Sequence, residues 1–389
     1  MVSLLLAVIY LAFISLGLPD SLLGAGWPVM YGELGVPLSY AGVISMIIAG
    51  GTIVSSLLSD RLTRRFGAGL VTAVSVGMTA AALLGFSLSG SFPWLCLFAV
   101  PYGLGAGAVD AALNNYVALH YSSRHMSWLH ACWGVGVSIS PYIMSFCLTR
   151  GYGWHLGYRT VSCMQIVLTA LLFFSLPAWK GRAAEGGGTA PKALTLRQTL
   201  RLPGAPCVLL AFFGFCAFET TAGLWASSYL VAYRYVSAET AARFTALFYL
   251  GETAGRFLNG FVADRMGDKR MIRIGGWTML AGALLILLPV SSTLPALVGL
   301  VIAGFGAAPV YPCIIHSTPH NFGRAHSQAL VGVQMASAYC GSTFMPPLFG
   351  WLAGRISMGL YPAYLAVFAG LMLAMTELLN RKLAGGVVQ

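Results

Sequence analysis

Twelve long apolar segments dominate this chain of 389 residues and constrain its fold more than any other feature. Each is about as long as the roughly 20 residues that a helix needs to cross a bilayer. Only 8% of the residues are charged, against about 25% in soluble proteins, which excludes a soluble enzyme, a nucleic-acid-binding protein and a disordered chain. We predict an all-α membrane protein whose twelve transmembrane helices lie near residues 2–30, 38–59, 67–89, 93–117, 126–149, 157–179, 204–231, 239–262, 270–290, 293–316, 326–350 and 358–380.

Basic residues give the chain a net charge of +11, and most of the 22 lysine and arginine residues lie in alternate loops between the predicted helices. The side of a membrane protein with more basic loops is normally the cytoplasmic side. We therefore expect both termini in the cytoplasm and the protein in the inner or plasma membrane. The charge orients the chain among membrane lipids, and we predict no nucleic-acid partner.

A polar, basic stretch divides the predicted helices into two sets of six. Residues 180–202 contain three consecutive glycines and several basic residues, a composition typical of a flexible linker. Equivalent residues recur about 200 positions apart on either side of it, as in the pairs Asp60/Asp264 and Asp20/Glu219. We predict an N-terminal six-helix bundle at 1–179, a cytoplasmic linker at 180–202 and a C-terminal six-helix bundle at 203–389.

The loops after the second and eighth predicted helices carry the same charge pattern. The first reads Asp60-Arg61-Leu-Thr-Arg64-Arg65 and the second reads Asp264-Arg265-Met-Gly-Asp-Lys-Arg270. With the repeat of six helices, these loops resemble those of the major facilitator superfamily, and the resemblance covers the whole chain. It implies two pseudo-symmetric bundles that transport a solute by alternating access. It also implies a cytoplasmic gating role for Asp60, Arg61, Arg64, Asp264, Arg265 and Arg270.

The aspartate of such a loop has a physical way to act as a gate. It can accept hydrogen bonds from the N-terminus of a neighbouring helix, which would hold the cytoplasmic side in one state and release it in another. The first loop departs from the family pattern, since Ser56 and Thr63 stand where the family has glycine. The alternative is that both loops only anchor the chain at the membrane surface.

Charged residues inside the predicted helices mark candidate functional sites, because each costs roughly 2.5–3.5 kcal/mol on insertion scales. Glu252 and Arg256 are four residues apart on one helix face, which predicts a structural ion pair. Asp20 and Asp110 have no basic residue within their own predicted helices. Since burial favours the neutral form of a carboxyl group, these two aspartates are our candidates for proton coupling.

Within the superfamily, the residues around these aspartates resemble the proton symporters related to fucose permease. The similar segments are 17–21, 103–114, 130–136 and 309–312. The resemblance implies proton-coupled sugar uptake through Asp20 and Asp110, with H+ as the coupling ion and no cofactor. The permease has amide residues on its fifth helix where this chain has His130 and Trp133, so we predict a sugar or a similar small hydroxylated solute rather than fucose itself.

A sugar site needs polar groups for the hydroxyls and aromatic faces for the apolar patches of the ring, and the predicted helices supply both. We predict substrate contacts from Asn114, Asn115, His130, Trp133, Glu219, Trp225, Tyr249, Tyr311 and Gln334. For each of them, packing or internal hydrogen bonding within a bundle is the alternative.

Other classes of protein fit the sequence less well. A drug or metabolite exporter of the same superfamily, working as a proton antiporter, is the main alternative, although the amides of the fourth helix favour a hydrophilic substrate. A membrane enzyme would need a catalytic motif, and neither HExxH nor a cluster of histidines and carboxylates occurs in the sequence. We therefore predict no catalytic or metal-binding residues, and we expect a monomer.

Overall fold

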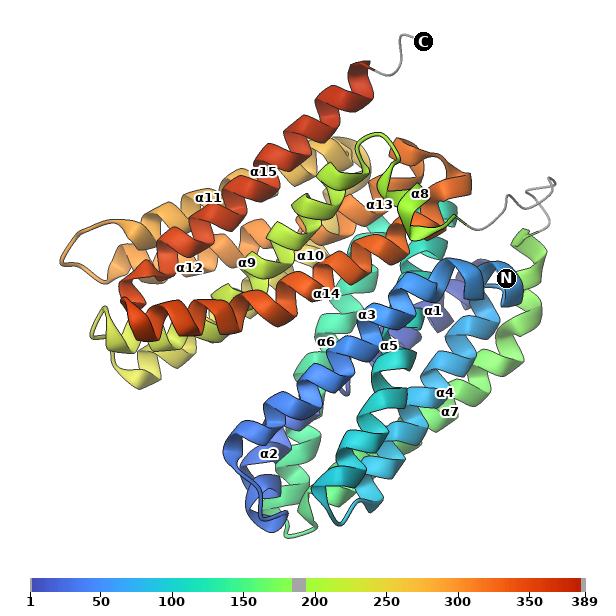
Figure 1. The fold of residues 1–389 in the computed structure, drawn as a ribbon, viewed down its shortest axis with the longest axis horizontal. Coiled ribbons are helices and arrows are strands. Elements are labelled where there is room, and N and C mark those ends of the chain that lie inside the picture. The colour runs from blue at the N-terminus through green and yellow to red at the C-terminus, as the bar shows by residue number, and fades with distance from the viewer. Residues whose placement is uncertain (1, 184–193, 386–389) are drawn as a thin grey trace. The chain divides into compact units, whose positions relative to one another are not determined.

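A computed structural model describes residues 2–183 and 194–385, and every regular element among them is a helix (Figure 1). The N-terminal half contains α1 (Val2–Gly17), α2 (Leu22–Glu33), η1 (Leu38–Tyr40), α3 (Ala41–Phe66), α4 (Ala68–Leu88), α5 (Phe92–His120), α6 (Ser123–Thr149) and α7 (Gly153–Ala183). The C-terminal half contains α8 (Leu196–Leu200), α9 (Ala205–Ala232), α10 (Ala238–Met266), α11 (Asp268–Leu287), α12 (Leu294–Ala307), α13 (Val310–Phe322), α14 (Arg324–Arg355), η2 (Met358–Leu360) and α15 (Tyr361–Gly385). Much of the predicted linker, residues 184–193, lies outside the described residues.

Ten helical segments in the described part of the chain are long and apolar enough to cross a membrane. Two of the ten combine a pair of helices, α1 with α2 and α12 with α13. Helices α10 and α14, with 29 and 32 residues, are also long enough to cross a membrane, but they contain more polar side chains. Together these segments form the twelve transmembrane helices of the predicted all-α fold, which is confirmed.

The chain divides into two compact units, which we describe one at a time. The first unit contains Met1–Tyr116 and Leu129–Leu194, and the second contains Val117–Trp128 and Thr195–Gln389. The segment 117–128, which connects α5 to α6, therefore packs with the second unit. The predicted bundles at 1–179 and 203–389 differ from these units chiefly in where this short segment belongs.

Two membrane-spanning segments are interrupted near their middle. Residues 18–21 form turns between α1 and α2, and Ala308 and Pro309 separate α12 from α13. Proline lacks a backbone N–H and so weakens a helix, and Pro19 lies in the first interruption. Proline does not interrupt every helix that contains it, since α6 continues through Pro141 and α14 continues through Pro346 and Pro347.

Glycines allow the helices of each unit to pack closely, and they do so at equivalent places. A Cβ atom on Gly103 would lie 2.2 Å from the carbonyl oxygen of Ile48, so α5 and α3 touch backbone to backbone. A Cβ atom on Gly304 would lie 2.3 Å from the carbonyl oxygen of Phe248, which brings α12 equally close to α10. The glycine-rich run at 103–107 thus serves helix packing.

Large apolar side chains cover much of the outer surface. Phe174, Val367 and Leu250 are 83%, 66% and 60% exposed. Apolar exposure on this scale is unusual in soluble proteins and is expected where helices face lipid. The described helices therefore present a surface that suits a bilayer, and Asp110, Glu252 and Arg256 are buried beneath it.

Candidate functional site

Asp20 lies in the interruption between α1 and α2, inside the first membrane-spanning segment. Its carboxyl group accepts hydrogen bonds from the hydroxyl of Tyr102, at 3.1 Å, and from the indole N–H of Trp133, at 2.9 Å. Tyr102 belongs to α5 and Trp133 to α6. Both donors are neutral, and Asp20 itself is exposed. The carboxyl group can therefore gain or lose a proton without breaking an ion pair with either donor.

The interruption around Asp20 is fixed to α6 by backbone and hydroxyl contacts. Ser21 Oγ donates to the carbonyl oxygen of Val137 and is also bonded to Ser140 Oγ, each at 2.7 Å. A Cβ atom on Gly17 would lie 2.2 Å from the carbonyl oxygen of Trp133, so only glycine permits this close approach. The position of Asp20 is thus determined by how the broken helix packs on α6.

Asp110 is buried in α5 and belongs to a chain of three polar side chains. Asn114 Nδ2 donates to Asp110 Oδ1 at 2.7 Å and to the backbone oxygen of Asp110 at 3.0 Å. On its other side, Asn114 Oδ1 lies 3.0 Å from His130 Nε2 of α6, and the ring of Phe13 packs edge-on against this imidazole. Asn115 is buried beside them. The structure therefore links Asp110 to a titratable histidine through one amide.

Helix α6 contacts the carboxyl group of Asp20 directly and is linked to that of Asp110 through Asn114. His130 belongs to the chain that reaches Asp110, and Trp133 bonds directly to Asp20. Residues three apart in a helix share a face, so one face of α6 carries both side chains. A shift of α6 would disturb the surroundings of Asp20 and Asp110 together.

In the second unit, three charged side chains meet near the middle of α9 and α10. Arg256 Nη2 donates to Glu219 Oε1 at 2.7 Å and also to Glu252 Oε1. The pair of Glu252 and Arg256 follows from their spacing on α10, whereas the addition of Glu219 depends on how α9 crosses α10. We refer to these three residues as the Glu-Arg-Glu triad.

The other predicted substrate residues of the second unit make contacts within that unit. Gln334 is fully buried and its Oε1 accepts from Thr318 at 3.1 Å, while Trp225 Nε1 donates to the carbonyl oxygen of Pro346 at 2.9 Å. Tyr311 Oη donates to the sulfur of Met335 at 3.3 Å. Tyr249 is 46% exposed. Of these four, Tyr249 is thus the most accessible from outside the unit.

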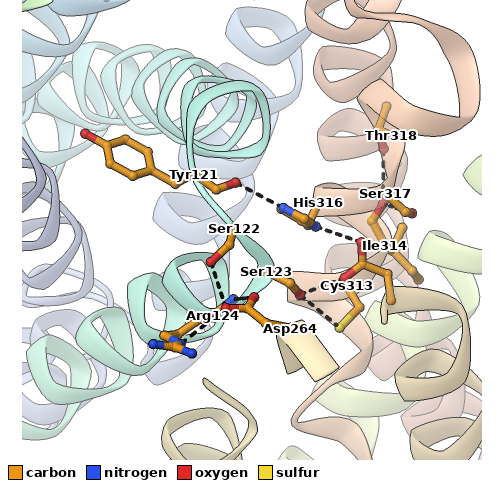
Figure 2. A network of polar contacts seen from close by, with 11 residues as sticks. Tyr121, Ser122, Ser123, Arg124, Asp264, Cys313, Ile314, His316, Ser317 and Thr318 are labelled. Carbon is orange, nitrogen blue, oxygen red and sulfur yellow. Dashed lines mark hydrogen bonds and ion pairs between the residues drawn. The ribbon is translucent and has the colours of Figure 1, made fainter. Parts of the chain in front are cut away.

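The second charged loop binds the segment 117–128 (Figure 2). Asp264 accepts the backbone N–H of Arg124 at 3.0 Å and the hydroxyl of Ser122 at 3.1 Å, and it forms an ion pair with the Arg124 side chain at 3.3 Å. Arg124 lies in the first turn of α6, where free N–H groups and the helix dipole favour a negative charge. The aspartate thus caps the N-terminus of α6.

A second cluster lies next to this cap and involves Asp268, the first residue of α11. Ser123 Oγ donates to Asp268 Oδ1 at 2.7 Å, and His316 Nδ1 lies 2.7 Å from Asp268 Oδ2. The other imidazole nitrogen of His316 lies 3.1 Å from the carbonyl oxygen of Tyr121, as Figure 2 shows. The segment is therefore held at several successive residues.

The first charged loop shows a different local contact. Asp60 is buried and accepts from Arg64 Nε, one turn later on α3, at 2.7 Å. Gly67 and Gly267 end α3 and α10 with the same positive φ, 79° and 77°, a conformation that favours glycine. The side chains of Arg61, Arg265 and Arg270 are exposed. The two loops share a backbone shape, but Asp60 bonds to an arginine of its own helix whereas Asp264 bonds to Ser122 and Arg124.

Sequence reasoning missed three residues that complete these sites: Tyr102, Asp268 and His316. Asp268 stood inside the quoted loop, and its place at the start of a helix was the available signal. Tyr102 and His316 gave no local signal, because a tyrosine or histidine in an apolar segment is common, and their partners come from other helices.

Two sets of membrane-spanning helices with ionisable groups among them define a multi-pass membrane transporter. The sequence model of the Major Facilitator Superfamily matches residues 9–242 and 221–382. The chain belongs to this superfamily, and its function is transport rather than enzymatic catalysis.

Individual relatives agree with this assignment. The uncharacterized transporter y4wD of Sinorhizobium fredii is 26% identical over 370 residues, which cover 91% of this chain and 92% of y4wD. The probable nitrate/nitrite antiporter NarK1 of Thermus thermophilus is 24% identical over 375 residues, which cover 85% and 82%. FucP, the fucose:proton symporter of E. coli, has a similar structure in its outward conformation, with a TM-score of 0.79 at 13% identity over 96% of this chain and 98% of FucP. That likeness confirms the predicted resemblance in fold.

Proposed function

We propose that this protein imports a sugar or a similar small hydroxylated solute together with protons. The observation that carries the proposal is the environment of Asp20. Its carboxyl group lies in a broken membrane helix, is exposed, and is bonded to the neutral donors Tyr102 and Trp133. An exposed carboxyl group inside a membrane helix needs water or a hydrophilic ligand beside it.

The same surroundings suit a hydroxylated ligand. A carboxylate accepts hydrogen bonds from hydroxyl groups, and an aromatic face can cover the apolar side of a sugar ring, so Asp20 and Trp133 offer both kinds of contact. The chain from Asp110 through Asn114 to His130 lies one turn of α6 away and provides a second group that can bind a proton. FucP, a fucose:proton symporter with the same fold, supports this choice of substrate class.

Counterflow in proteoliposomes tests the proposal. Purified protein is reconstituted with each of a panel of unlabelled sugars inside, and entry of the labelled sugar is measured. Counterflow requires exchange of substrate but no net movement of protons. We expect one sugar to exchange in the wild type and in Asp110→Asn, while only the wild type accumulates that sugar when a pH gradient is imposed.

Asp20→Asn tests the substrate contact as well as coupling, and we expect it to weaken both exchange and accumulation. Glu239→Gln is the matched control, because Glu239 is an exposed acid on α10 that pairs with Arg243, and it should behave as wild type. Failure of every sugar to exchange in the wild type would reject the sugar assignment.

Proton antiport is the second candidate function. The similarity over 85% of this chain to NarK1, a probable nitrate/nitrite antiporter, favours exchange of two solutes over symport. The two functions differ in the sign of proton movement, which a pH-sensitive dye inside the vesicles records. Entry of substrate together with acidification of the vesicle interior indicates symport, and entry together with alkalinisation indicates antiport.

The remaining parts of the proposal concern the membrane context. We expect both termini in the cytoplasm, because the basic loops lie on one side of the predicted topology. We also propose that the protein is a monomer in the cell membrane. The contacts of Asp264 with Ser122 and Arg124 then lie at the cytoplasmic face and act as a latch that opens and closes during transport. Reporter fusions at the two termini and in alternate loops test the orientation.

A further inference from the structure

The Glu-Arg-Glu triad contains more acidic than basic groups. One nitrogen atom, Arg256 Nη2, serves both Glu219 Oε1 and Glu252 Oε1. Because both oxygens accept from the same nitrogen atom, the two carboxyl groups lie close enough to interact with each other. With all three groups ionised, the cluster would carry one uncompensated negative charge.

Burial makes that charge costly. The side chains of Arg256 and Glu252 are only 4% and 5% exposed, and that of Glu219 is 17% exposed. Both α9 and α10 cross the membrane, where an uncompensated charge has little water to stabilise it. The same arrangement at the protein surface would be stabilised by solvent, as for Glu239 and Arg243 at 75% and 72% exposure.

The groups around the triad do not supply a second positive charge from the helices that pack on it. Tyr249 of α10 and Tyr311 of α13 lie close enough to interact electrostatically with the triad, and a phenol is neutral at physiological pH. Helix α12 has no charged residue, and the arginines of α14 stand at its two ends. The basic residues of α11 lie in its first two turns, and His316 of α13 is bonded to Asp268. In α15 the charged residues also lie near the end of the helix.

We propose that the Glu-Arg-Glu triad is a binding site for one exchangeable proton, shared by Glu219 and Glu252. When two carboxyl groups occupy one site, repulsion between like charges keeps one of them protonated. A proton from water adds to one carboxylate oxygen, and the resulting O–H can donate to the other carboxylate. The remaining carboxylate balances Arg256, so the occupied site is neutral overall.

The site differs in kind from those at Asp20 and Asp110. Its proton is held against a permanent cation, and Glu219 and Arg256 come from different helices. Movement of α9 relative to α10 separates Glu219 from Arg256 and thereby changes how strongly the proton is held. The site thus gives the second unit its own protonation step, whatever solute the protein carries.

Infrared spectroscopy of the full-length protein in lipid nanodiscs tests the proposal without any substrate. The C=O stretching band of a protonated carboxyl group is well separated from that of a carboxylate, and it shifts in heavy water. An Asp20→Asn/Asp110→Asn background removes the two other candidate acids. In that background we expect such a band at neutral pH, and we expect it to vanish as the pH is raised.

Single substitutions distinguish a shared proton from one that belongs to a single residue. We expect Glu219→Gln and Glu252→Gln each to abolish the band, because the carboxylate that remains pairs with Arg256 and needs no proton. Arg256→Gln should instead increase it, since both carboxyl groups then become neutral. Glu239→Gln should leave it unchanged.

Two results would overturn the proposal. One is a band that survives in Glu252→Gln but not in Glu219→Gln. That result would mean that the proton belongs to Glu219 alone, and that Glu252 and Arg256 form an ordinary ion pair beside it. The other is the absence of any band that responds to the two glutamate variants. Both readouts come from folded, monodisperse protein and do not depend on transport, so they remain decisive if the sugar assignment fails.

Discussion

His316 Nδ1 lies 2.7 Å from Asp268 Oδ2, and its other ring nitrogen faces the carbonyl oxygen of Tyr121 at 3.1 Å. A carbonyl oxygen only accepts hydrogen bonds, and a neutral imidazole has a single N–H to donate. A neutral His316 beside an ionised Asp268 can therefore make only one of these two hydrogen bonds. Both form only when the His316–Asp268 pair carries one additional proton. We therefore expect the attachment of segment 117–128 to the second unit to include a bound proton.

Rising pH should loosen this segment. Loss of the proton removes a charge-assisted hydrogen bond, which contributes about 1.5–3 kcal/mol, and it leaves an unprotonated nitrogen facing an acceptor. We expect hydrogen exchange of residues 117–128, corrected for its intrinsic pH dependence, to accelerate about tenfold or more as the proton is lost.

His316→Gln isolates this effect. We expect exchange in the segment to become faster at acidic pH and nearly independent of pH. His320→Gln is the control, because His320 is an exposed histidine near the end of the same helix, α13. Protection of wild-type segment 117–128 that does not vary with pH would contradict the bound proton.

The cap formed by Asp264 gives a second prediction. Asp264→Asn removes the negative charge from the first turn of α6 and weakens the bonds from Ser122 and Arg124. Because Arg124 and Asp264 are 45% and 29% exposed, we expect a loss of only about 1 kcal/mol. The amide of Arg124 should exchange several times faster, whereas Arg270→Gln, a change at an exposed arginine of the same loop, should have no such effect.

Glycine packing gives a third prediction. Gly107→Ala places a methyl group 2.2 Å from the carbonyl oxygen of Thr52, so α5 and α3 must move apart. Overpacking of this kind costs about 1–3 kcal/mol, and the unfolding temperature in detergent should fall. Gly50→Ala is the matched control, since its Cβ atom meets nothing within 4 Å and alanine favours a helix. Equal unfolding temperatures for the two variants would mean that the close approach does not stabilise the unit.

How far the sequence predicts this molecule depends on the range of each interaction. Twelve apolar segments predict the helices, and the spacing of Glu252 and Arg256 predicts a contact along one helix face. The cap by Asp264 was also predictable in kind, because its loop precedes a helix junction. The partner helix, α6, was not predicted, because Arg124 lies 140 residues away from Asp264 in the sequence.

Contacts between helices were beyond the sequence. Nothing local indicates that Glu219 reaches Arg256, or that Tyr102 and Trp133 converge on Asp20. The helix pattern identifies the polar face of each helix but not which faces meet. Each of these contacts depends on where two helices cross in the folded protein. Pro141 illustrates the same limit, since α6 remains continuous there and membrane helices tolerate proline when neighbours satisfy the backbone.

The triad gives the last prediction, which concerns stability. Arg256→Met leaves two carboxyl groups buried without their cation, and breaking a buried ion pair from one side costs about 3–5 kcal/mol. Both groups are then neutral in the folded protein but ionise on unfolding, so stability should fall more steeply with rising pH than in the wild type. The triple variant Glu219→Gln/Glu252→Gln/Arg256→Met removes all three charges and should recover most of the loss. Unfolding temperatures of the wild type, Arg256→Met and the triple variant, compared at acidic and mildly alkaline pH, test this prediction. A triple variant as unstable as Arg256→Met would show that the loss of stability comes from packing around Arg256 and not from charge.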